Sequence, residues 1–200
     1  MPIPQLAVPP NGLFTVYGFP FKTIKVKKSF FSYYKYKNKL LMSASAWDNP
    51  FPKYDYPKDL EVLEISIVNE KLKTFFVPEG VKHLHLVGKD LGKIKIPTLP
   101  KSLVSFSIID YSKSVKIPDL SYLPKLKYIS LSGIGLAKYP VLPKSATHIF
   151  LSRNRFRSFT DDKLLEKYPK LKIMTLSKKY LRISPALENK YDGILDIFRT

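Results

Sequence analysis

One recurring pattern constrains the fold of this 200-residue chain more than any other feature. The spacing Leu-x-x-Leu-x-Leu returns six times, with apolar substitutions, between Leu60 and Leu181. The triplets are Leu60, Leu63, Ile65; Val81, Leu84, Leu86; Leu103, Phe106, Ile108; Leu126, Ile129, Leu131; Ala146, Ile149, Leu151; and Leu171, Met174, Leu176. Successive triplets start 21, 22, 23, 20 and 25 residues apart. Such a period is typical of a solenoid in which each unit adds one short strand and buries its apolar side against its neighbours.

The composition adds a strong basic charge to this scaffold. The chain has 34 Lys and Arg against 16 Asp and Glu, a formal net charge of +18, and its 44% apolar content fits a single domain. A basic excess of this size indicates a polyanionic partner, either nucleic acid or an anionic membrane surface. The membrane surface is the weaker alternative, because we find no amphipathic basic helix in the sequence.

The sequence also bears on the cellular compartment. It contains no cysteine, which excludes disulfides and Cys-based zinc sites and favours a reducing environment. Residues 1–10 lack the basic region of a signal peptide and are interrupted by prolines. No run of about 18 apolar residues predicts a membrane span. We therefore expect a cytoplasmic protein.

Three segments are predicted. Residues 1–58 form a Pro-rich and basic-aromatic extension and cap, residues 59–182 hold the repeats, and residues 183–200 form a C-terminal cap helix. A helix is expected to start at Ser184-Pro185 and to place five apolar side chains at helical spacing: Leu187, Tyr191, Ile194, Leu195 and Phe198. A further helix over Thr160–Tyr168, with an N-cap residue and acids in its first turn, accounts for the 25-residue step.

The basic-aromatic part of the N-terminal segment has two interpretations. Partial alternation at Thr23–Val26 and at Tyr33–Leu40 predicts one or two strands that cover the open end of the solenoid. The same residues could form a nucleic-acid arm, in which lysines neutralise phosphates and aromatic rings stack on bases. The candidate RNA-binding residues here are Lys25, Lys27, Lys28, Tyr33, Tyr34, Lys35, Lys37 and Lys39.

Lysines recur just before the predicted strands. Five of the six repeats carry Pro-Lys in this place, which gives Lys58, Lys101, Lys125, Lys144 and Lys170, whereas the second repeat has Pro78-Glu79. Because the units stack, these lysines should form a ladder, and Lys82, Lys127 and Lys172 should thicken it. Like charges on neighbouring strands are mildly destabilising unless something neutralises them. The ladder is either a solvated edge that prevents aggregation or a row of phosphate contacts.

A second basic group follows the fifth and sixth strands. Arg153, Arg155 and Arg157 are expected beside Lys178 and Lys179 of the next repeat, with Arg182 following in the chain. Guanidinium groups match phosphate oxygens and stack on bases. We therefore expect these residues to bind RNA as well.

The third candidate surface is the outward face of the predicted sheet. We expect it to be an exposed polar and aromatic surface: Glu61, Glu64, His83, His85, Ser105, Ser107, Tyr128, Ser130, His148, Phe150, Ser152, Thr175 and Ser177. The candidate contacts on it are His83, His85, Tyr128, His148 and Phe150. At about 4.8 Å per strand, His83 and His148 would lie roughly 14 Å apart, too far for one metal ion. We expect neither a metal nor a cofactor.

The repeats resemble the short, Leu-Pro-containing class of the leucine-rich repeat superfamily. The matching segments are Ile96-Pro-Thr-Leu-Pro-Lys-Ser-Leu103 and Tyr139-Pro-Val-Leu-Pro-Lys-Ser-Ala146. The resemblance covers residues 60–182 and implies a strand-dominated α/β solenoid with a parallel concave sheet and an irregular convex side. Of the asparagine ladder typical of that family, only Asn154 is in strict register. Family membership would imply a binding scaffold and leaves the ligand open.

No catalytic constellation is recognisable. The sequence lacks a phosphate-binding Gly-rich loop, a nucleophile elbow and a His-Glu-x-x-His motif, so we expect no enzyme and no small-molecule substrate. Two functions stay open. One is a structural RNA-binding protein of a large ribonucleoprotein such as the ribosome, in contact with rRNA and neighbouring proteins. The other is a leucine-rich-repeat scaffold for an acidic protein partner.

Overall fold

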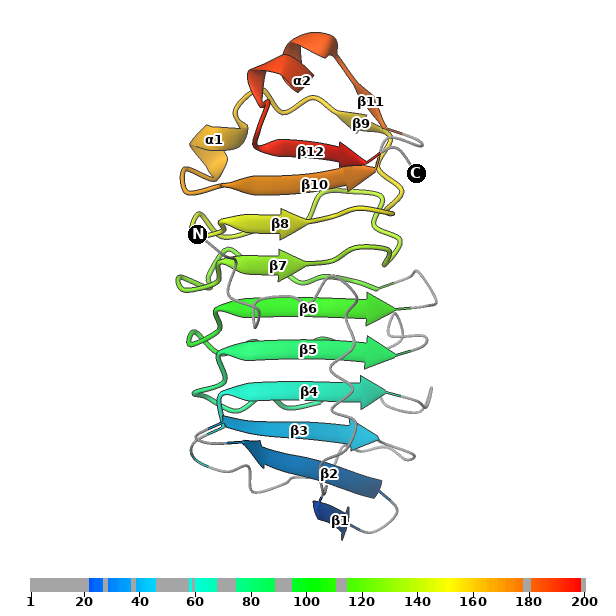
Figure 1. Ribbon diagram of the computed structural model, residues 1–200, viewed down its shortest axis with the longest axis vertical. Helices are drawn as coiled ribbons and strands as arrows, with labels where there is room; N and C mark the ends of the chain where they lie inside the picture. Colours follow the sequence, from blue (N-terminus) through cyan, green and yellow to red (C-terminus); the bar gives the residue numbers. More distant parts are fainter. Residues whose placement is uncertain are drawn as a thin grey trace.

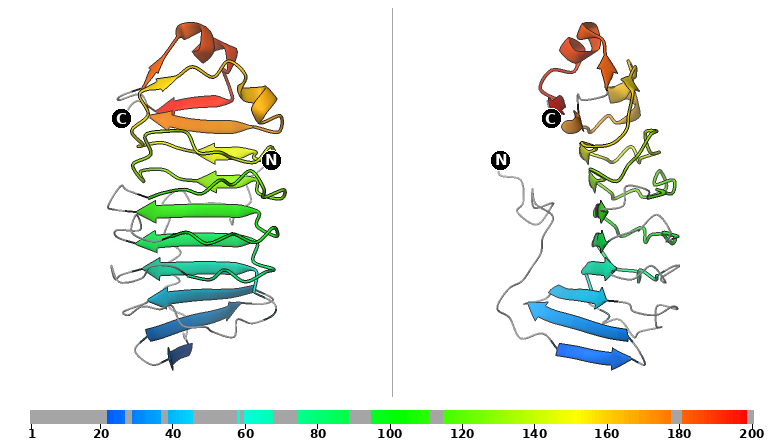
Figure 2. Two further views of the ribbon diagram at one scale, coloured as in Figure 1. Left: turned by 180° about the vertical axis from the view of Figure 1, so that it is seen from behind. Right: turned by 90° about the vertical axis from the view of Figure 1, so that its right-hand side faces the viewer.

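The fold is a strand-dominated β-solenoid of about five turns with few helices. The computed structural model describes residues 22–26, 29–36, 39–45, 58, 60–67, 75–88, 95–110, 115–177 and 181–198, with the backbone alone at 22–26, 29–36, 39–45, 66–67, 110 and 198. Its main sheet has seven parallel strands: β4 (Val62–Ile67), β5 (His83–Gly88), β6 (Ser105–Asp110), β7 (Tyr128–Ser130), β8 (His148–Phe150), β10 (Ile173–Ser177) and β12 (Leu195–Phe198). The strands stack along the long axis (Figure 1), and connecting segments run behind them (Figure 2).

The apolar triplets form the core, as the sequence predicts. All of their side chains are at most 7% exposed, and they belong to one continuous cluster. Their register is direct, since Leu63 lies opposite Leu84, Leu84 opposite Phe106, and Phe106 opposite Ile129. Each repeat therefore buries its apolar residues against the same positions of the next repeat, and that contact stabilises the array.

A repeated turn brings the chain into each strand. In five repeats a carbonyl oxygen accepts a hydrogen bond from the N–H of the first apolar residue, three positions later, at 3.0–3.4 Å: Pro78 to Val81, Pro100 to Leu103, Leu123 to Leu126, Pro143 to Ala146, and Tyr168 to Leu171. The residue after the first apolar residue then contacts the following repeat, because its carbonyl accepts hydrogen bonds from two N–H groups there. The Glu61 carbonyl, for example, accepts from the N–H groups of Lys82 and His83 at 2.7 and 3.0 Å. The N-terminal edge of the sheet is consequently built from the same local geometry in successive repeats.

Beyond the strands, the connecting segments are less regular. Asn154 is 8% exposed; its Nδ2 donates to the carbonyls of Leu131 and Leu151 at 2.8 and 2.9 Å, and its Oδ1 accepts from the N–H of Leu136 at 3.0 Å. One side chain thus satisfies three backbone groups in two repeats. A small parallel sheet, β9 (Ser158–Phe159) with β11 (Arg182–Ile183), links the last connecting segments.

At the N-terminal end, three antiparallel strands are present: β1 (Lys22–Val26), β2 (Ser29–Tyr36) and β3 (Lys39–Ser45). β3 lies beside β4 (Figure 1), so this sheet extends the stack. The strand expected over Thr23–Val26 is present, but Tyr33–Leu40 is not one strand. The chain reverses between Tyr36 and Lys39, which are paired. Alternation of apolar and polar residues continues through such a reversal and cannot reveal it.

The two predicted helices are shorter than expected. α1 spans only Leu164–Lys167, and its N-cap position is Lys163, with no capping side chain, rather than Thr160. The Asp161 carboxylate instead accepts from the N–H of Lys163 at 3.1 Å, and the Leu164 N–H donates to the Tyr191 hydroxyl at 3.1 Å. One local contact and one tertiary contact, from Asp161 and Tyr191, therefore take the place of the predicted cap. α2 spans Pro185–Lys190 and begins as predicted, with Ser184 Oγ accepting from the N–H of Leu187 at 3.3 Å.

The predicted cap helix over 183–200 is wrong beyond Lys190. Gly193 has a φ of 75°, in the left-handed region that stops a helix, and β12 follows as the last strand of the main sheet. Leu195 pairs with Met174 and Ile197 with Leu176, so the alternating apolar residues extend the sheet. The apolar stripe still covers the end of the core, because Tyr191 is buried and Leu187, Ile194 and Leu195 pack against the cluster.

Candidate functional site

The N-terminal edge of the sheet carries the lysine ladder that the repeats predict. Lys58, Lys101, Lys125, Lys144 and Lys170 are all exposed, and the last four lie in consecutive turns. Glu79 is exposed in the turn between the first two lysines. With strands about 4.8 Å apart, the four consecutive lysines span roughly 14 Å. The edge therefore presents a short row of ammonium groups to solvent.

The ladder has a fine structure that the Pro-Lys pattern conceals. In the turns of Lys101 and Lys144, the proline supplies the accepting carbonyl and lysine follows at the second turn position. In the turns of Lys125 and Lys170, the proline itself takes the second position and lysine the third. The ammonium groups therefore start from alternating places in the turn. The row is staggered rather than straight.

A second row, Lys82, Lys127 and Lys172, lies two or three residues further along three of the repeats. Lys82 forms an ion pair with Glu61 at 2.6 Å, so its charge is neutralised within the protein. Among the described residues, the ion pairs join Lys82 to Glu61, Lys163 to Glu166 and Lys167 to Asp161. Lys127 and Lys172 take no part in them, and neither does a lysine of the first row. The positive charge of this edge is therefore least compensated from β7 to β10.

The arginine group lies on the far side of the strands. Arg153, Arg155, Arg157 and Arg182 are exposed, and in the described part of the chain no arginine forms an ion pair. The Arg182 N–H donates to the Arg157 carbonyl at 2.8 Å, so the first residue of β11 lies beside the residue that precedes β9. Lys178 and Lys179 lie outside the described residues, so the predicted contact with them has no structural account.

The backbone of Arg153 is unusual. Its φ is 58°, the left-handed value that Gly133 adopts at the corresponding point one repeat earlier, where φ is 75°. A Cβ placed on Gly133 would be 3.9 Å from the Cβ of Arg153, so the two residues are stacked. The Arg153 N–H donates to Ser177 Oγ at 2.6 Å. A cation therefore occupies a turn position that normally favours glycine.

One basic feature of the sequence lies outside the repeat motifs. From residue 120 to residue 160 the chain contains no Asp or Glu, but it contains seven cations: Lys125, Lys127, Lys138, Lys144, Arg153, Arg155 and Arg157. Lys138 belongs to no repeat motif, yet it is exposed. The signal that could have identified it is the long interval between Asp119 and Asp161. Uncompensated charge is concentrated in this part of the solenoid.

The outward face of the sheet is less exposed than predicted. His85, Ser105, Ser107 and Thr175 are between 3% and 8% exposed. In the register, Ser105 lies between His83 and Tyr128, and both neighbours have larger side chains. Strands about 4.8 Å apart let large side chains cover small ones between them. The face is therefore a partly closed polar surface.

Among the candidate contacts on this face, Tyr128 and His148 form a pair. Their rings stack with centroids 4.7 Å apart, and both are half-buried, as is Phe150 in the next row. Burial, with a contribution from the charge of Lys172, lowers the pKa of His148. At neutral pH the imidazole is therefore uncharged. Burial also raises the pKa of Glu64, near the other end of this face, to about 7.

The remaining predictions concern metals and the N-terminal segment. No group of three or more potential metal ligands occurs within the described ranges. His83 and His148 are three strands apart, as the repeat register predicts. None of the helices in the described part of the chain is long and apolar enough to span a membrane. Lys27, Lys28 and Lys37 lie outside the described residues, whereas Lys25, Tyr33, Tyr34, Lys35 and Lys39 lie in β1–β3, where the backbone alone is described.

Comparison with protein-family models, curated proteins and solved structures gave no match to this chain. We therefore infer the function from the geometry and charge of the protein's own surfaces.

Proposed function

We propose that this protein is a non-enzymatic, structural RNA-binding protein of the cytoplasm, built on a leucine-rich-repeat scaffold, in a large ribonucleoprotein such as the ribosome. The observation that carries the proposal is the row of four exposed lysines in consecutive turns, Lys101, Lys125, Lys144 and Lys170, whose charge no acidic residue in the described part of the chain pairs with. A row of like charges at strand spacing is self-repelling. A phosphate backbone would neutralise it.

The leucine-rich-repeat assignment is supported by the periods of 20 to 25 residues and by Asn154, whose side chain satisfies three backbone groups as a ladder asparagine would. A scaffold of this kind gives every repeat the same edge geometry. A charge placed at one turn is therefore repeated by the next, which suits a ligand that is itself a repeating chain of charges. RNA phosphates are such a ligand.

The test is the salt dependence of RNA binding. Replacement of Lys101, Lys125, Lys144 and Lys170 by Gln lowers the net charge from +18 to +14. For single-stranded RNA, the slope of log K against log salt is about −0.7 per neutralised phosphate, so the variant should lose up to about 3 units of slope. Binding would be measured by fluorescence anisotropy with an oligonucleotide between about 50 and 200 mM salt.

The matched control compares two double variants. Lys95→Gln with Lys116→Gln changes two exposed lysines that lie away from the N-terminal edge and outside the row, and Lys125→Gln with Lys144→Gln changes the net charge by the same amount within the row. We expect the variant outside the row to retain most of the wild-type slope. Equal slopes for the two variants would mean that only total charge matters, and would contradict binding along the lysine row.

The stacked rings of Tyr128 and His148 favour a second candidate, a scaffold for an acidic protein partner. Half-buried aromatic rings are common anchors of protein interfaces, and Lys127 and Lys172 are exposed directly before β7 and β10. In this case the replacement of Tyr128 by Ser should abolish partner binding, while the Gln substitutions in the lysine row should have little effect. The RNA-binding proposal predicts the opposite order.

A further inference from the structure

A cavity of about 980 Å³ opens between two consecutive connecting segments, residues 137–142 and residues 155–168. Its floor includes the core residues Leu142, Leu151 and Met174. The cavity therefore extends from the surface to the hydrophobic core. None of the sequence motifs predicts it.

The repeat lengths explain why the cavity is there. The first segment belongs to the shortest repeat, of 20 residues, and the second to the longest, of 25 residues. Connecting segments of equal length stack evenly, as the strands do, but these two cannot. The extra residues of the long repeat form α1 and the loop before it, which stand away from the preceding repeat and form the outer wall.

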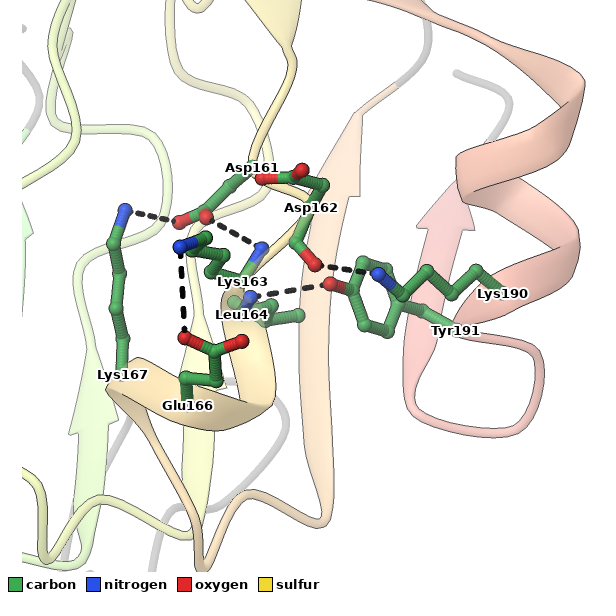
Figure 3. Close-up of polar contacts among 8 residues, drawn as sticks. All are labelled: Asp161, Asp162, Lys163, Leu164, Glu166, Lys167, Lys190 and Tyr191. Carbon is green, nitrogen blue, oxygen red and sulfur yellow. Dashed lines mark hydrogen bonds and ion pairs between the residues drawn. The ribbon is translucent and has the colours of Figure 1, made fainter.

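That wall is held by a set of polar contacts (Figure 3). Lys167 Nζ donates to Asp161 Oδ2 at 2.7 Å, and Lys190 Nζ donates to the carbonyl oxygen of Asp162 at 2.6 Å. The Tyr191 hydroxyl accepts from the Leu164 N–H at 3.1 Å. The loop is thus connected to α1 and to the C-terminal part of the chain. These contacts restrain the outer wall of the cavity.

Inside the cavity, aromatic rings form a stacking surface. Tyr139 lies parallel to Phe156, with ring centroids 4.2 Å apart and an interplanar angle of 10°, and Phe159 meets it nearly edge-on at 5.9 Å. Phe156 and Phe159 are buried, whereas Tyr139 is 38% exposed. Since Phe156 covers one face of Tyr139, exposed ring surface is left for another planar group.

The charge of the lining favours an anion. Five cations and two acids line the cavity, and the carboxylate of Asp161 is already paired with Lys167. Lys138, Arg155 and Arg157 are exposed and take part in no ion pair among the described residues. Burial, followed by the charge of Asp161, raises the pKa of Tyr139, so its phenol stays neutral and does not repel an anion.

We propose that this cavity binds one unpaired nucleotide of an RNA strand. The base stacks on Tyr139, and Arg155 and Arg157 bind its phosphate. Stacking of a base on an aromatic side chain is tolerant of sequence, and guanidinium groups match phosphate oxygens. The physiological source of the nucleotide rests on the RNA-binding function proposed above, but the chemistry of the site can be tested without that function.

A nucleotide fits the lining better than either of its parts. A free phosphate would leave the ring surface and the apolar floor unoccupied, and an uncharged aromatic compound would leave the cations unpaired. Both features lie in one cavity, and a nucleotide supplies a planar ring and an anion together.

Adenosine 5′-monophosphate is the probe, with adenosine and ribose 5-phosphate for comparison. Binding to the full-length protein would be measured by isothermal titration calorimetry, and its location by the NMR signals of labelled tyrosines. We expect the monophosphate to bind more tightly than adenosine or ribose 5-phosphate and to shift the Tyr139 signal. Replacement of Tyr139 by Leu should weaken binding of the monophosphate about tenfold, which is the effect of losing one base stack.

Three further variants make the result specific. Tyr139→Phe keeps the stacking ring and should retain binding, which separates lost stacking from misfolding. Tyr122→Leu is the matched control, because Tyr122 is equally 38% exposed and also hydrogen-bonds to the backbone, but lies outside the cavity. Arg155→Gln combined with Arg157→Gln should weaken binding of the monophosphate and leave binding of adenosine unchanged.

The outcomes separate this inference from the proposed function. Monophosphate binding at Tyr139 in a protein that does not bind RNA would support the cavity and refute the function. Salt-dependent RNA binding without any monophosphate effect at Tyr139 would refute the cavity and leave the function intact. Preference for an acidic, tyrosine-containing peptide over the monophosphate would also overturn the inference.

Discussion

The N-terminal edge of the sheet and the region of the cavity are built from the same repeats by different means. At the edge, each repeat uses the same turn, so side chains at one position form a row. At the cavity, repeats of 20 and 25 residues adjoin, and their connecting segments do not stack evenly. Equal repeats can therefore create a surface that suits a repeating ligand, whereas a change in repeat length creates a site for a single ligand group.

The largest expected effect concerns the packing of a buried phenylalanine in each part of the solenoid. Phe106 lies on β6 at 0% exposure between Leu84 and Ile129, whereas Phe156 is buried but lines the cavity. Phe106→Ala should destabilise the protein by about 3–5 kcal/mol, because it leaves a sealed void. Phe156→Ala should cost less, because it enlarges a space that already opens to solvent. Urea unfolding measures both; equal losses would contradict the distinction between a regular and an open side.

The next effect concerns Asn154, whose side chain joins the backbone of two adjacent repeats beyond their strands. Asn154→Ala removes the partners of two carbonyls and one N–H, and a buried group left unsatisfied costs about 1–3 kcal/mol. We expect a loss of about 2–4 kcal/mol in the free energy of unfolding. Asn189→Ala, at an exposed position of α2, is the control and should change it by less than about 0.5 kcal/mol. A small loss at Asn154 would show that water replaces the amide.

The two regions also differ in what the sequence could predict. The triplets keep a fixed internal spacing, so the buried positions, the parallel strands and the exposed lysines after five of the six strand-preceding prolines follow from one pattern. The position of Asn154 was also predicted, from its register with the asparagine ladder of the repeats. Each of these features is local to a repeat and is copied by the next, which is why sequence spacing alone is enough to place it.

The unpredicted features depend on contacts between distant parts of the chain. α1 is capped by Tyr191, 27 residues away from Leu164, and β12 forms because β10 has a free edge. The ring stack of Tyr139 and Phe156 brings together residues of two connecting segments that share no motif. Small serines on the sheet are buried by their neighbours, not by their own type. Residue type and spacing carry no record of these contacts.

A third prediction uses the pH dependence of stability on the sheet. Burial raises the pKa of Glu64 from 4.5 to about 7, so the folded state binds a proton that the unfolded state has already released between these pH values. Stability should therefore fall as pH rises from about 4.5 to about 7, and stay low above it. Glu64→Gln should remove this loss, with a gain of about 1–2 kcal/mol at pH 8.

The control for Glu64 lies in α1. Glu166 in α1 is exposed and approaches Lys163 only at 4.0 Å, so Glu166→Gln should leave the pH profile of unfolding unchanged. Urea unfolding at pH 5 and pH 8 compares the three proteins. Parallel profiles for wild type and Glu64→Gln would show that the carboxylate is as well solvated on the sheet as it is on α1.

The smallest effect concerns Arg153, whose backbone conformation is locally unfavourable. At the φ of 58° of Arg153, a residue with a Cβ destabilises the folded state by about 1–2 kcal/mol. Glycine avoids this strain, but it destabilises the protein by about 0.4–1 kcal/mol because it raises the entropy of the unfolded chain. Arg153→Gly should therefore be about 0.5 kcal/mol more stable than Arg153→Ala, which retains the Cβ. Both variants remove the guanidinium, so both should reduce the salt dependence of RNA binding to the same degree. If the glycine variant gains stability while RNA binding weakens, the arginine is present at this turn for its charge. If RNA binding is unchanged in both, the interface is confined to the lysine row and the cavity.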